Sequence, residues 1–251
     1  MSARSSCRQH RDKQPEVILG VVSPHLDDAW LSCARLIAAH PGSHVITVFA
    51  GGPTSMPALT SWDRRSACFR NGDDVIAVRR DEDRRSAEML GGTSHHLPFW
   101  DSQYRIDTYS YEGPNDEELP THITRALAAM AVELQPDAWV VPLGIGHRDH
   151  EVVGTACLGL VCEIEGSFYV YEELPYRVET PKIVEQAVQK LHRDGFKLER
   201  DRGMPAGGSL LEKVHAVRCH RSQLRALGRR RVLRAILRSE RIWRLVQPQS
   251  A

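Results

Sequence analysis

The pattern of apolar and polar residues along the chain predicts strands and helices that alternate. Five short apolar runs have the composition and length of buried strands: 16–22, 44–50, 94–97, 138–142 and 168–171. Four longer segments repeat apolar residues at helical spacing: 29–39, 78–90, 116–134 and 151–164. His40-Pro41-Gly42 and Gly91-Gly92 supply the stops that end the first two helices.

This alternation predicts an α/β fold of three layers, with a mostly parallel sheet between two layers of helices. The range 98–115 has no clear period, and we expect it to be a long irregular connection. The polar residues 1–15 lack the apolar core of a signal peptide, so we expect a disordered lead-in before one domain at 16–227. Residues 228–251 are predicted to form a basic, helical C-terminal tail.

The C-terminal region is unusually rich in arginine, with ten arginines between Arg218 and Arg244. Apolar residues recur among them at near-helical spacing, as at Leu233 and Ile236. Such a basic amphipathic segment can lie on a membrane surface or contact nucleic acid. A helix that packs on the core and exposes its basic side is the commoner case, and we favour it.

Composition limits the class of protein but does not identify the chemistry. The 251 residues are 41% hydrophobic and 26% charged, which is typical of a globular domain with a sizeable core. A net charge of +1 gives no strong overall field for nucleic acid or membranes, and no apolar run approaches the roughly 18 residues that span a bilayer. The six cysteines include no C-x-x-C pair, so we expect reduced thiols and a cytoplasmic location.

The candidate catalytic and metal-binding residues lie in two short turns, PHLDD and GHRDH. His25, Asp27 and Asp28 directly follow the first predicted strand, and His147, Asp149 and His150 follow the fourth. Ligands of parallel sheets bind beyond the carboxyl ends of the strands, so both turns are predicted to meet at one edge. Imidazole nitrogens and carboxylate oxygens are ordinary zinc ligands, and a divalent cation removes the repulsion between Asp27 and Asp28.

Simpler interpretations exist for each turn alone. Asp27 or Asp28 could cap the helix that starts near Ala29, and His and Asp are common in loops. The two turns together favour a metal site. Spacing alone does not separate zinc from iron or manganese.

These motifs resemble those of a known family. PHLDD before a helix, H-x-D-H some 120 residues later, and Arg79-x-x-Glu82 followed by Leu90-Gly91 look like the PIG-L (LmbE-like) zinc-dependent N-deacetylases. The resemblance covers roughly residues 16–165. It implies a Rossmann-like fold and hydrolysis of N-acetyl or N-acyl groups from glucosamine-type sugars, as in glycosylphosphatidylinositol-precursor, mycothiol-pathway and antibiotic-pathway deacetylases.

The resemblance also implies roles for individual residues. His25, Asp28 and His150 would bind zinc, and Asp27 would be the general base that activates water. His147 would be the second acid/base group, with Asp149 orienting its ring. Arg79 matches an arginine that approaches the substrate.

The chain departs from the commoner family motifs without changing these candidates. Leu26 and Ala29 replace the proline and glutamate of HPDDE, and Arg148 replaces the proline of HPDH. Some relatives carry a tyrosine that supports the oxyanion where this chain has Ile145.

The stretch Trp100–Arg105 adds candidates for substrate binding. Trp100, Asp101 and Arg105 combine an aromatic face with polar ends, as sugar sites do, and the stretch Tyr171–Arg177 has the same combination. Loop packing is the commoner explanation for any single one of these residues. We therefore expect a zinc N-deacetylase that acts on a small N-acyl amino-sugar conjugate, with Fe²⁺ as the alternative metal. The alternatives are another metal-dependent amidase or phosphoesterase, or a binding protein without catalysis; no nucleic-acid partner and no membrane span are expected, and the oligomeric state is left open.

Overall fold

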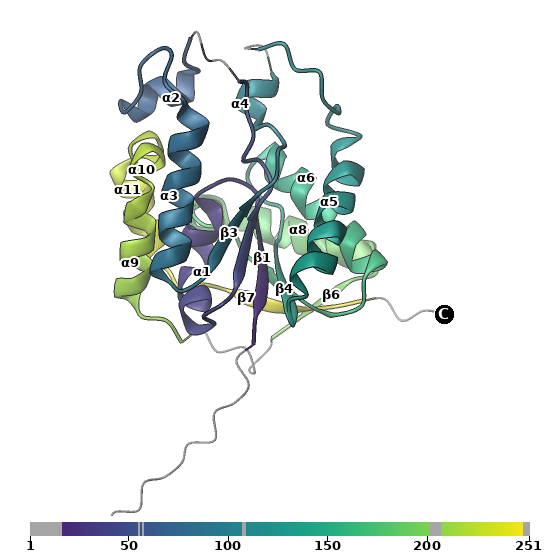
Figure 1. The fold of residues 1–251 in the computed structure, drawn as a ribbon. Helices are drawn as coiled ribbons and strands as arrows, with labels where there is room; N and C mark the ends of the chain where they lie inside the picture. Colours follow the sequence, from purple (N-terminus) through teal and green to yellow (C-terminus); the bar gives the residue numbers. More distant parts are fainter. Residues whose placement is uncertain (1–16, 55, 57, 107–108, 201–206, 248–251) are drawn as a thin grey trace, which may run out of the picture.

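The computed structural model describes residues 17–247 apart from 55, 57, 107–108 and 201–206, so the predicted lead-in at 1–15 lies outside the described residues. Its centre is a seven-stranded sheet in the order β3-β2-β1-β4-β5-β7-β6 (Figure 1). The strands are β1 (Leu19–Ser23), β2 (His44–Thr47), β3 (Thr93–His96), β4 (Ala138–Pro142), β5 (Ser167–Tyr171), β6 (Lys197–Glu199) and β7 (Ile242–Val246). Strands β1 to β5 pair in parallel, whereas β7 is antiparallel to both β5 and β6. The predicted α/β fold with a mostly parallel sheet is confirmed.

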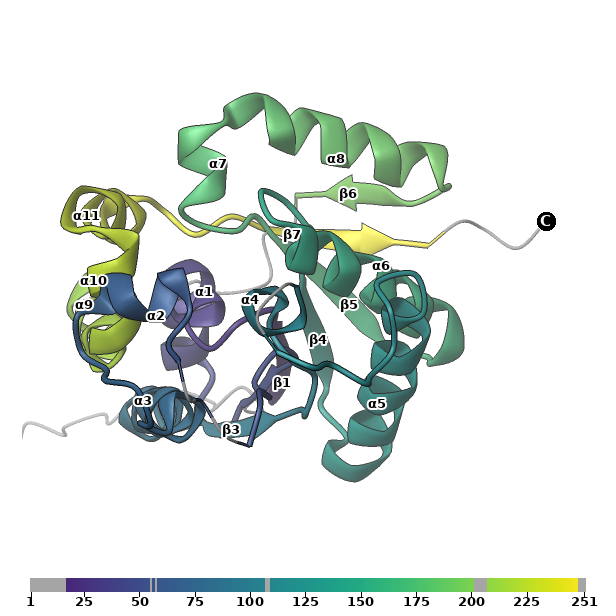
Figure 2. The same cartoon turned by 90° about the horizontal axis from the view of Figure 1, so that it is seen from above.

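Helices cover both faces of the sheet. The helices of the described residues are α1 (Asp28–Ala39), α2 (Ser61–Ser66), α3 (Val75–Met89), α4 (Ser102–Arg105), α5 (Leu119–Leu134), α6 (Arg148–Glu163), α7 (Tyr176–Glu179), α8 (Pro181–Arg193), α9 (Leu210–Cys219), α10 (Arg221–Leu227) and α11 (Arg229–Leu237). Helices α5, α6 and α8 lie on one side of the sheet, and α1, α3, α9 and α11 lie on the other (Figure 2). Each layer buries its own apolar cluster against the sheet, as the three-layer prediction requires.

The C-terminal region is more fully integrated than the sequence predicts. Helix α11 buries Val232 and Ala235 against α1 and α9, which agrees with the core-packing interpretation. Beyond it, β7 occupies an interior position of the sheet between β5 and β6. The prediction of a helical tail at 228–251 is therefore wrong for Ile242–Val246, which form a strand because their apolar residues complete the sheet.

A buried ion pair fixes the segment between α11 and β7. The Lys213 ammonium lies 3.3 Å from the Glu240 carboxylate, and both side chains are at most 1% exposed. Glu240 also accepts the backbone N–H groups of Arg35 and Leu36 on α1. The last part of the chain is thus held to the first helix by a charge that would be costly to leave unpaired.

Topology places two turns side by side. Strands β1 and β4 are neighbours and run in the same direction, so their carboxyl ends meet at one edge of the sheet. The turn after β1 leads into α1, and the turn after β4 leads into α6. Helix α6 begins at Arg148 rather than at the predicted 151, so its first turn contains most of the second motif.

No helix among the described residues has the length and apolar character needed to cross a membrane. The cysteines in the described part of the chain are free thiols: Cys33, Cys68, Cys157, Cys162 and Cys219.

One buried histidine away from the sheet edge links three helices. His220 is 1% exposed, stacks on Trp30 of α1 and lies with Nε2 2.9 Å from the Ser86 hydroxyl of α3. Burial, and to a lesser degree the charge of Arg85, lowers the pKa of His220 to about 3. The folded protein therefore holds this imidazole in its neutral form.

We expect His220 to make folding stability depend on pH. In the unfolded chain it takes up a proton below its ordinary pKa of about 6.5, whereas in the folded chain it stays neutral down to about pH 3. The free energy of unfolding should therefore fall as the pH falls through this window, by at most about 1.4 kcal/mol per pH unit from this residue. Urea unfolding at a series of pH values should give a shallower dependence for His220→Gln than for the unmodified protein, and equal slopes would contradict this account.

Candidate metal centre and active site

The turn after β1 is built around the hydroxyl of Ser23. Ser23 Oγ donates to the carbonyl oxygen of His25 (2.6 Å) and accepts the N–H of Ala29 (3.0 Å) in the first turn of α1. Asp27 occupies the N-cap position but its side chain forms no capping hydrogen bond. The capping interpretation of Asp27 and Asp28 is therefore not supported. The hydroxyl of Ser23, not a carboxylate, accepts the N–H in the first turn of the helix, and both carboxylates remain available for other contacts.

The turn after β4 depends on two glycines. Gly144 and Gly146 have φ angles of +82° and +83°, a region that strongly favours glycine. A Cβ on Gly146 would also lie 2.3 Å from the ring of Tyr176. This path brings His147 to the N-cap of α6, where its Nδ1 accepts the N–H of Asp149 (3.2 Å).

The two turns bring His25, Asp28 and His150 together. Asp28 Oδ2 lies 3.1 Å from His25 Nδ1 and 3.0 Å from His150 Nε2. One ligand atom from each of the three lies within 4.8 Å of the others. Ligands bound to one zinc ion at about 2.0–2.1 Å in a tetrahedral arrangement lie roughly 3.3 Å apart, so the cluster has the dimensions of a metal site.

A buried nitrogen without a hydrogen bond supports this interpretation. His150 is fully buried, and its Nε2 forms no hydrogen bond despite the short distance to Asp28. Its Nδ1 donates to Glu173 Oε1 (3.3 Å), which leaves Nε2 of the neutral ring as an electron-pair donor facing His25 and Asp28. Since a buried unpaired nitrogen is costly, a cation between these groups fits the residues present.

Buried carboxylates surround the two imidazoles. Asp149 Oδ2 lies 3.0 Å from His25 Nε2, and Glu173 contacts His150 from the other side. Burial alone would lower the pKa of His150, but Asp28 and Glu173 outweigh it and raise the pKa to about 9. Burial likewise opposes the charged form of His25, yet Asp101, Asp149 and Asp28 raise its pKa. The cluster therefore stabilises positive charge at its centre.

A second group of residues meets the same distance requirement and shares a ligand with the first. It consists of His25, His147 and Asp149. Its carboxylate already has other partners, because Asp149 accepts from the Ser102 N–H and from Arg105, and His147 Nδ1 accepts the Asp149 N–H. The group of His25, Asp28 and His150 is the better candidate.

Asp27 lies outside both candidate metal groups but lines a cavity that adjoins them. It is 8% exposed and lines a cavity of about 560 Å³ together with His25, Asp28 and His147. Burial and the neighbouring Asp28 raise the pKa of Asp27 to about 7, against the opposing charges of His25, Arg79 and His150. The two adjacent acids therefore differ in environment: Asp28 contacts both imidazoles, and Asp27 faces the space where a substrate can lie.

His147 and Asp149 are close to each other but are not hydrogen-bonded through their side chains. Asp149 Oδ2 lies 3.9 Å from His147 Nδ1, and its bonds go to His25, Arg105 and Ser102. The expected contact that orients the His147 ring is instead supplied by the Asp149 backbone N–H. Because Nδ1 is the acceptor, a neutral His147 carries its proton on Nε2.

Of the residues predicted to bind substrate, only Asp101 lines the cavity. Arg105 has a 3% exposed side chain and binds Asp149 (2.8 Å) and Asp116 (3.0 Å), so it supports the site through Asp149. Trp100 packs against Tyr111 outside the cavity, in agreement with the loop-packing alternative. The oxyanion position noted at Ile145 is also buried away from the cavity.

The structure corrects the placement of Arg79. Its side chain is 2% exposed and forms a 2.7 Å ion pair with Asp63 of α2, so it does not reach the cavity. Glu82, one helical turn later, accepts the N–H and hydroxyl of Ser222 on α10. This Arg-x-x-Glu motif thus anchors α2 and α10, the two helices that supply Trp62 and Gln223 to the cavity wall.

Glu173 and Tyr176 belong to the stretch Tyr171–Arg177, but the sequence did not predict either as an individual site residue. Glu173 is fully buried and accepts from the N–H groups of Gly144 (2.7 Å) and Ile145 (3.0 Å) as well as from His150. Tyr176 lines the cavity, and its ring centroid lies 5.0 Å from that of His150. A signal for both exists, because Glu172-Glu173 follows the fifth predicted strand just as the two motifs follow theirs.

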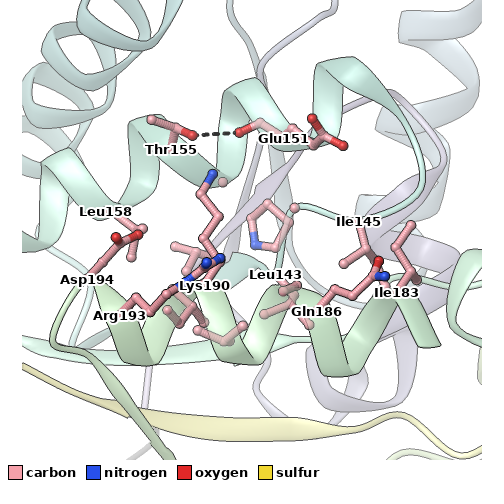
Figure 3. A pocket seen from close by; sticks show the side chains of 17 residues that line it. Leu143, Ile145, Glu151, Thr155, Leu158, Ile183, Gln186, Lys190, Arg193 and Asp194 are labelled. Atoms are coloured by element: carbon pink, nitrogen blue, oxygen red, sulfur yellow. Dashed lines mark hydrogen bonds between the residues drawn. The ribbon is translucent and has the colours of Figure 1, made fainter. Parts of the chain in front are cut away.

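A separate cavity of about 320 Å³ lies between α6 and α8 (Figure 3). Its walls include Leu143, Ile145 and Ile183 together with the charged residues Glu151 and Lys190. It contains no member of either candidate metal group found in the described residues. The candidate metal ligands and the candidate base lie instead at the cavity of about 560 Å³ beside the sheet edge.

Comparison with known proteins shows similarity to deacetylases. Residues 20–161 match the family model of GlcNAc-PI de-N-acetylase (PIG-L). The 2'-N-acetylparomamine deacetylase of Streptomyces fradiae is 26% identical over 216 residues, which is 81% of this chain and 72% of that protein.

Two solved structures are similar over nearly their whole length. The A40926 pseudoaglycone deacetylase Dbv21 is 25% identical with a TM-score of 0.74, and the match covers 95% of this chain and 100% of that one. The zinc-inhibited form of the teicoplanin deacetylase Orf2 is 26% identical with the same TM-score of 0.74, covering 93% and 99%.

We expect Glu173 to control metal affinity through His150. Glu173→Gln keeps the size of the side chain but removes the charge that accepts the imidazole proton, so affinity for zinc should fall about 10- to 100-fold. Competition with a fluorescent chelator measures this change. Glu172→Gln is the matched control, because Glu172 is equally buried but bonds Trp243 and Arg177 instead; a similar loss in both variants would contradict a specific role for Glu173.

Proposed function

Because the chain belongs to the GlcNAc-PI de-N-acetylase (PIG-L) family, we propose that it is a metal-dependent hydrolase that removes an N-acetyl group from an amino-sugar conjugate. The observation that carries this proposal is the convergence of His25, Asp28 and His150 beside Asp27 in one cavity. A metal-dependent amide hydrolase needs a Lewis acid, a base next to it and space for the substrate. The two turns supply candidate metal ligands and a candidate base, and the cavity that they share with α2 and α10 supplies the space.

The relatives indicate the class of substrate. Their names refer to N-acetylparomamine, to a pseudoaglycone and to teicoplanin. We infer that this chain acts on a comparable amino-sugar glycoside in secondary metabolism. The cavity of about 560 Å³ lies within the usual range for small-molecule sites, and its walls combine aromatic side chains such as Trp62 with polar ones such as Gln103 and Gln223.

Zinc is the metal we propose for the site. Two imidazoles and one carboxylate are a usual set of protein ligands for catalytic zinc, although the same donors also suit Fe²⁺. His25, Asp28 and His150 would hold the zinc ion, which would supply Lewis acidity to an amide carbonyl and to a nearby water.

Asp27 is placed to act as the general base. Its carboxylate is next to the ligand Asp28 in sequence but faces the cavity, so it can accept a proton from water as that water attacks the carbonyl carbon. Neighbouring positive charge favours the ionised, proton-accepting form of a carboxyl group.

We infer that His147 is the second acid/base group. It lines the same cavity, its side chain is 36% exposed, and its Nδ1 is held by the Asp149 N–H. Its Nε2–H can therefore donate to the developing oxyanion or protonate the departing amine. Asp149, held by Arg105, keeps the ring of His25 in place through Nε2.

We expect Asp27→Asn to separate metal binding from catalysis. The variant should retain one metal ion per chain, because Asp27 is outside the ligand set, but kcat should fall about 10²- to 10⁴-fold. Metal analysis and steady-state kinetics of the purified variant test this. Asp81→Asn makes the same chemical change on the exposed face of α3 and should leave kcat unchanged; an active Asp27→Asn enzyme would rule out Asp27 as the base.

The activity itself is tested by amine release. A panel of N-acetylated amino-sugar conjugates, including free N-acetylglucosamine and larger glycosides, should contain substrates that yield a free amine and acetate. A chelator should abolish the reaction, and added zinc should restore it. If no member of the panel releases amine and a phosphoester is cleaved instead, the proposed reaction is wrong.

A further inference from the structure

A basic groove lies on the outer side of the C-terminal helices, away from the cavity. It is a hollow of about 1150 Å³ between the end of α3 and helices α9, α10 and α11, whose positions Figure 2 shows. The residues that define it are Arg85, Met89, His215, Arg218, Cys219, Arg221, Leu224, Arg225, Arg229, Val232, Leu233 and Ile236. Helices α10 and α11 also form a wall of the active-site cavity through Gln223, Leu227 and Arg231.

The residues that line the groove carry positive charge, and no acidic residue of the lining neutralises it. Its lining contains five arginines and no acidic residue. Arg218, Arg221 and Arg229 are exposed and form no ion pair with the described residues; only Arg85 has one, with Asp81. Because the chain as a whole has a net charge of +1, this face differs strongly from the average surface.

Exposed apolar side chains lie among these arginines. Met89 and Leu233 in the groove are 52% and 56% exposed, and Leu237, one helical turn beyond Leu233, is 62% exposed. Leu233 and Leu237 share one side of α11 because they are four residues apart. Their apolar neighbours Val232 and Ala235 pack into the core, so these two leucines are not needed for that contact.

We propose that the basic groove binds the surface of a membrane that contains anionic phospholipids. Arginine provides attraction to the headgroups, and exposed leucine and methionine insert among the first carbons of the acyl chains, which is the combination found in interfacial helices. Docking through α10 and α11 brings a wall of the active-site cavity next to the lipid surface. This inference does not depend on the reaction proposed above.

Other occupants fit less well. A second copy of the chain would set arginine against arginine. Residues 1–16 of the same chain carry Arg4, Arg8, Arg11 and Lys13 against Asp12 and Glu16, so they would also be repelled. Single-stranded nucleic acid would leave the leucines without apolar partners, and the groove lacks Trp, Tyr and Phe side chains for base stacking.

Vesicle sedimentation with the full chain tests the proposal. The protein should bind vesicles of phosphatidylcholine mixed with phosphatidylglycerol, bind poorly to phosphatidylcholine alone, and lose binding as salt is raised. The double variant Arg221→Glu, Arg229→Glu should weaken binding by at least about ten-fold. Lys182→Glu with Arg193→Glu on α8 changes the net charge equally at exposed positions on another face and should bind like the unmodified protein.

A second pair of variants tests the apolar contribution. Leu233→Ser with Leu237→Ser removes exposed side chains only, so the fold should be retained, and vesicle binding should weaken while the charge is unchanged. Absence of binding to anionic vesicles at low salt would overturn the proposal. It would also be overturned if the α8 control lost binding as much as the groove variant, or if DNA oligonucleotides bound more tightly than vesicles and without any effect of the leucine variants.

Discussion

The central constraint on this structure is the burial of opposite charges at one edge of the sheet. Asp28, Asp149 and Glu173 are almost fully removed from water, and each contacts a histidine of the cluster. Such an arrangement is stable only if positive charge is present between the carboxylates. The neighbouring strands β1 and β4 deliver the two turns to one place, and Glu173 arrives from the end of β5. Three adjacent strands therefore contribute to one candidate cation site.

The helices around this site are held by equally buried polar contacts. Arg79 binds Asp63 on α2, and Glu82 binds Ser222 on α10, so a single helix, α3, positions two walls of the cavity. Asp83, the next residue, accepts from Trp30 on α1 and from His96 on β3. Arg79, which the sequence suggested as a substrate-binding residue, thus helps to fix the helices that wall the cavity.

Local patterns were sufficient to predict the first five strands along the chain and the four longer helices that alternate with them, because periodicity and strand-to-helix turns are encoded by neighbouring residues. Helix α8 was not predicted. The position of Arg79 was not predictable in this way, since its partner Asp63 belongs to a short helix with no clear periodicity. Strand β7 was missed because Ile242–Val246 follows an arginine-rich helix and pairs with residues about 70 positions earlier. Contacts of this kind depend on the complete fold.

The most direct test of the cation site is a crystal of the zinc-loaded protein measured at the zinc absorption edge. We predict one strong anomalous peak per chain, within bonding distance of His25, Asp28 and His150, with Asp27 beside it and Glu173 on the far side of His150. A peak between His147 and Asp149, or no peak near His150, would contradict the account.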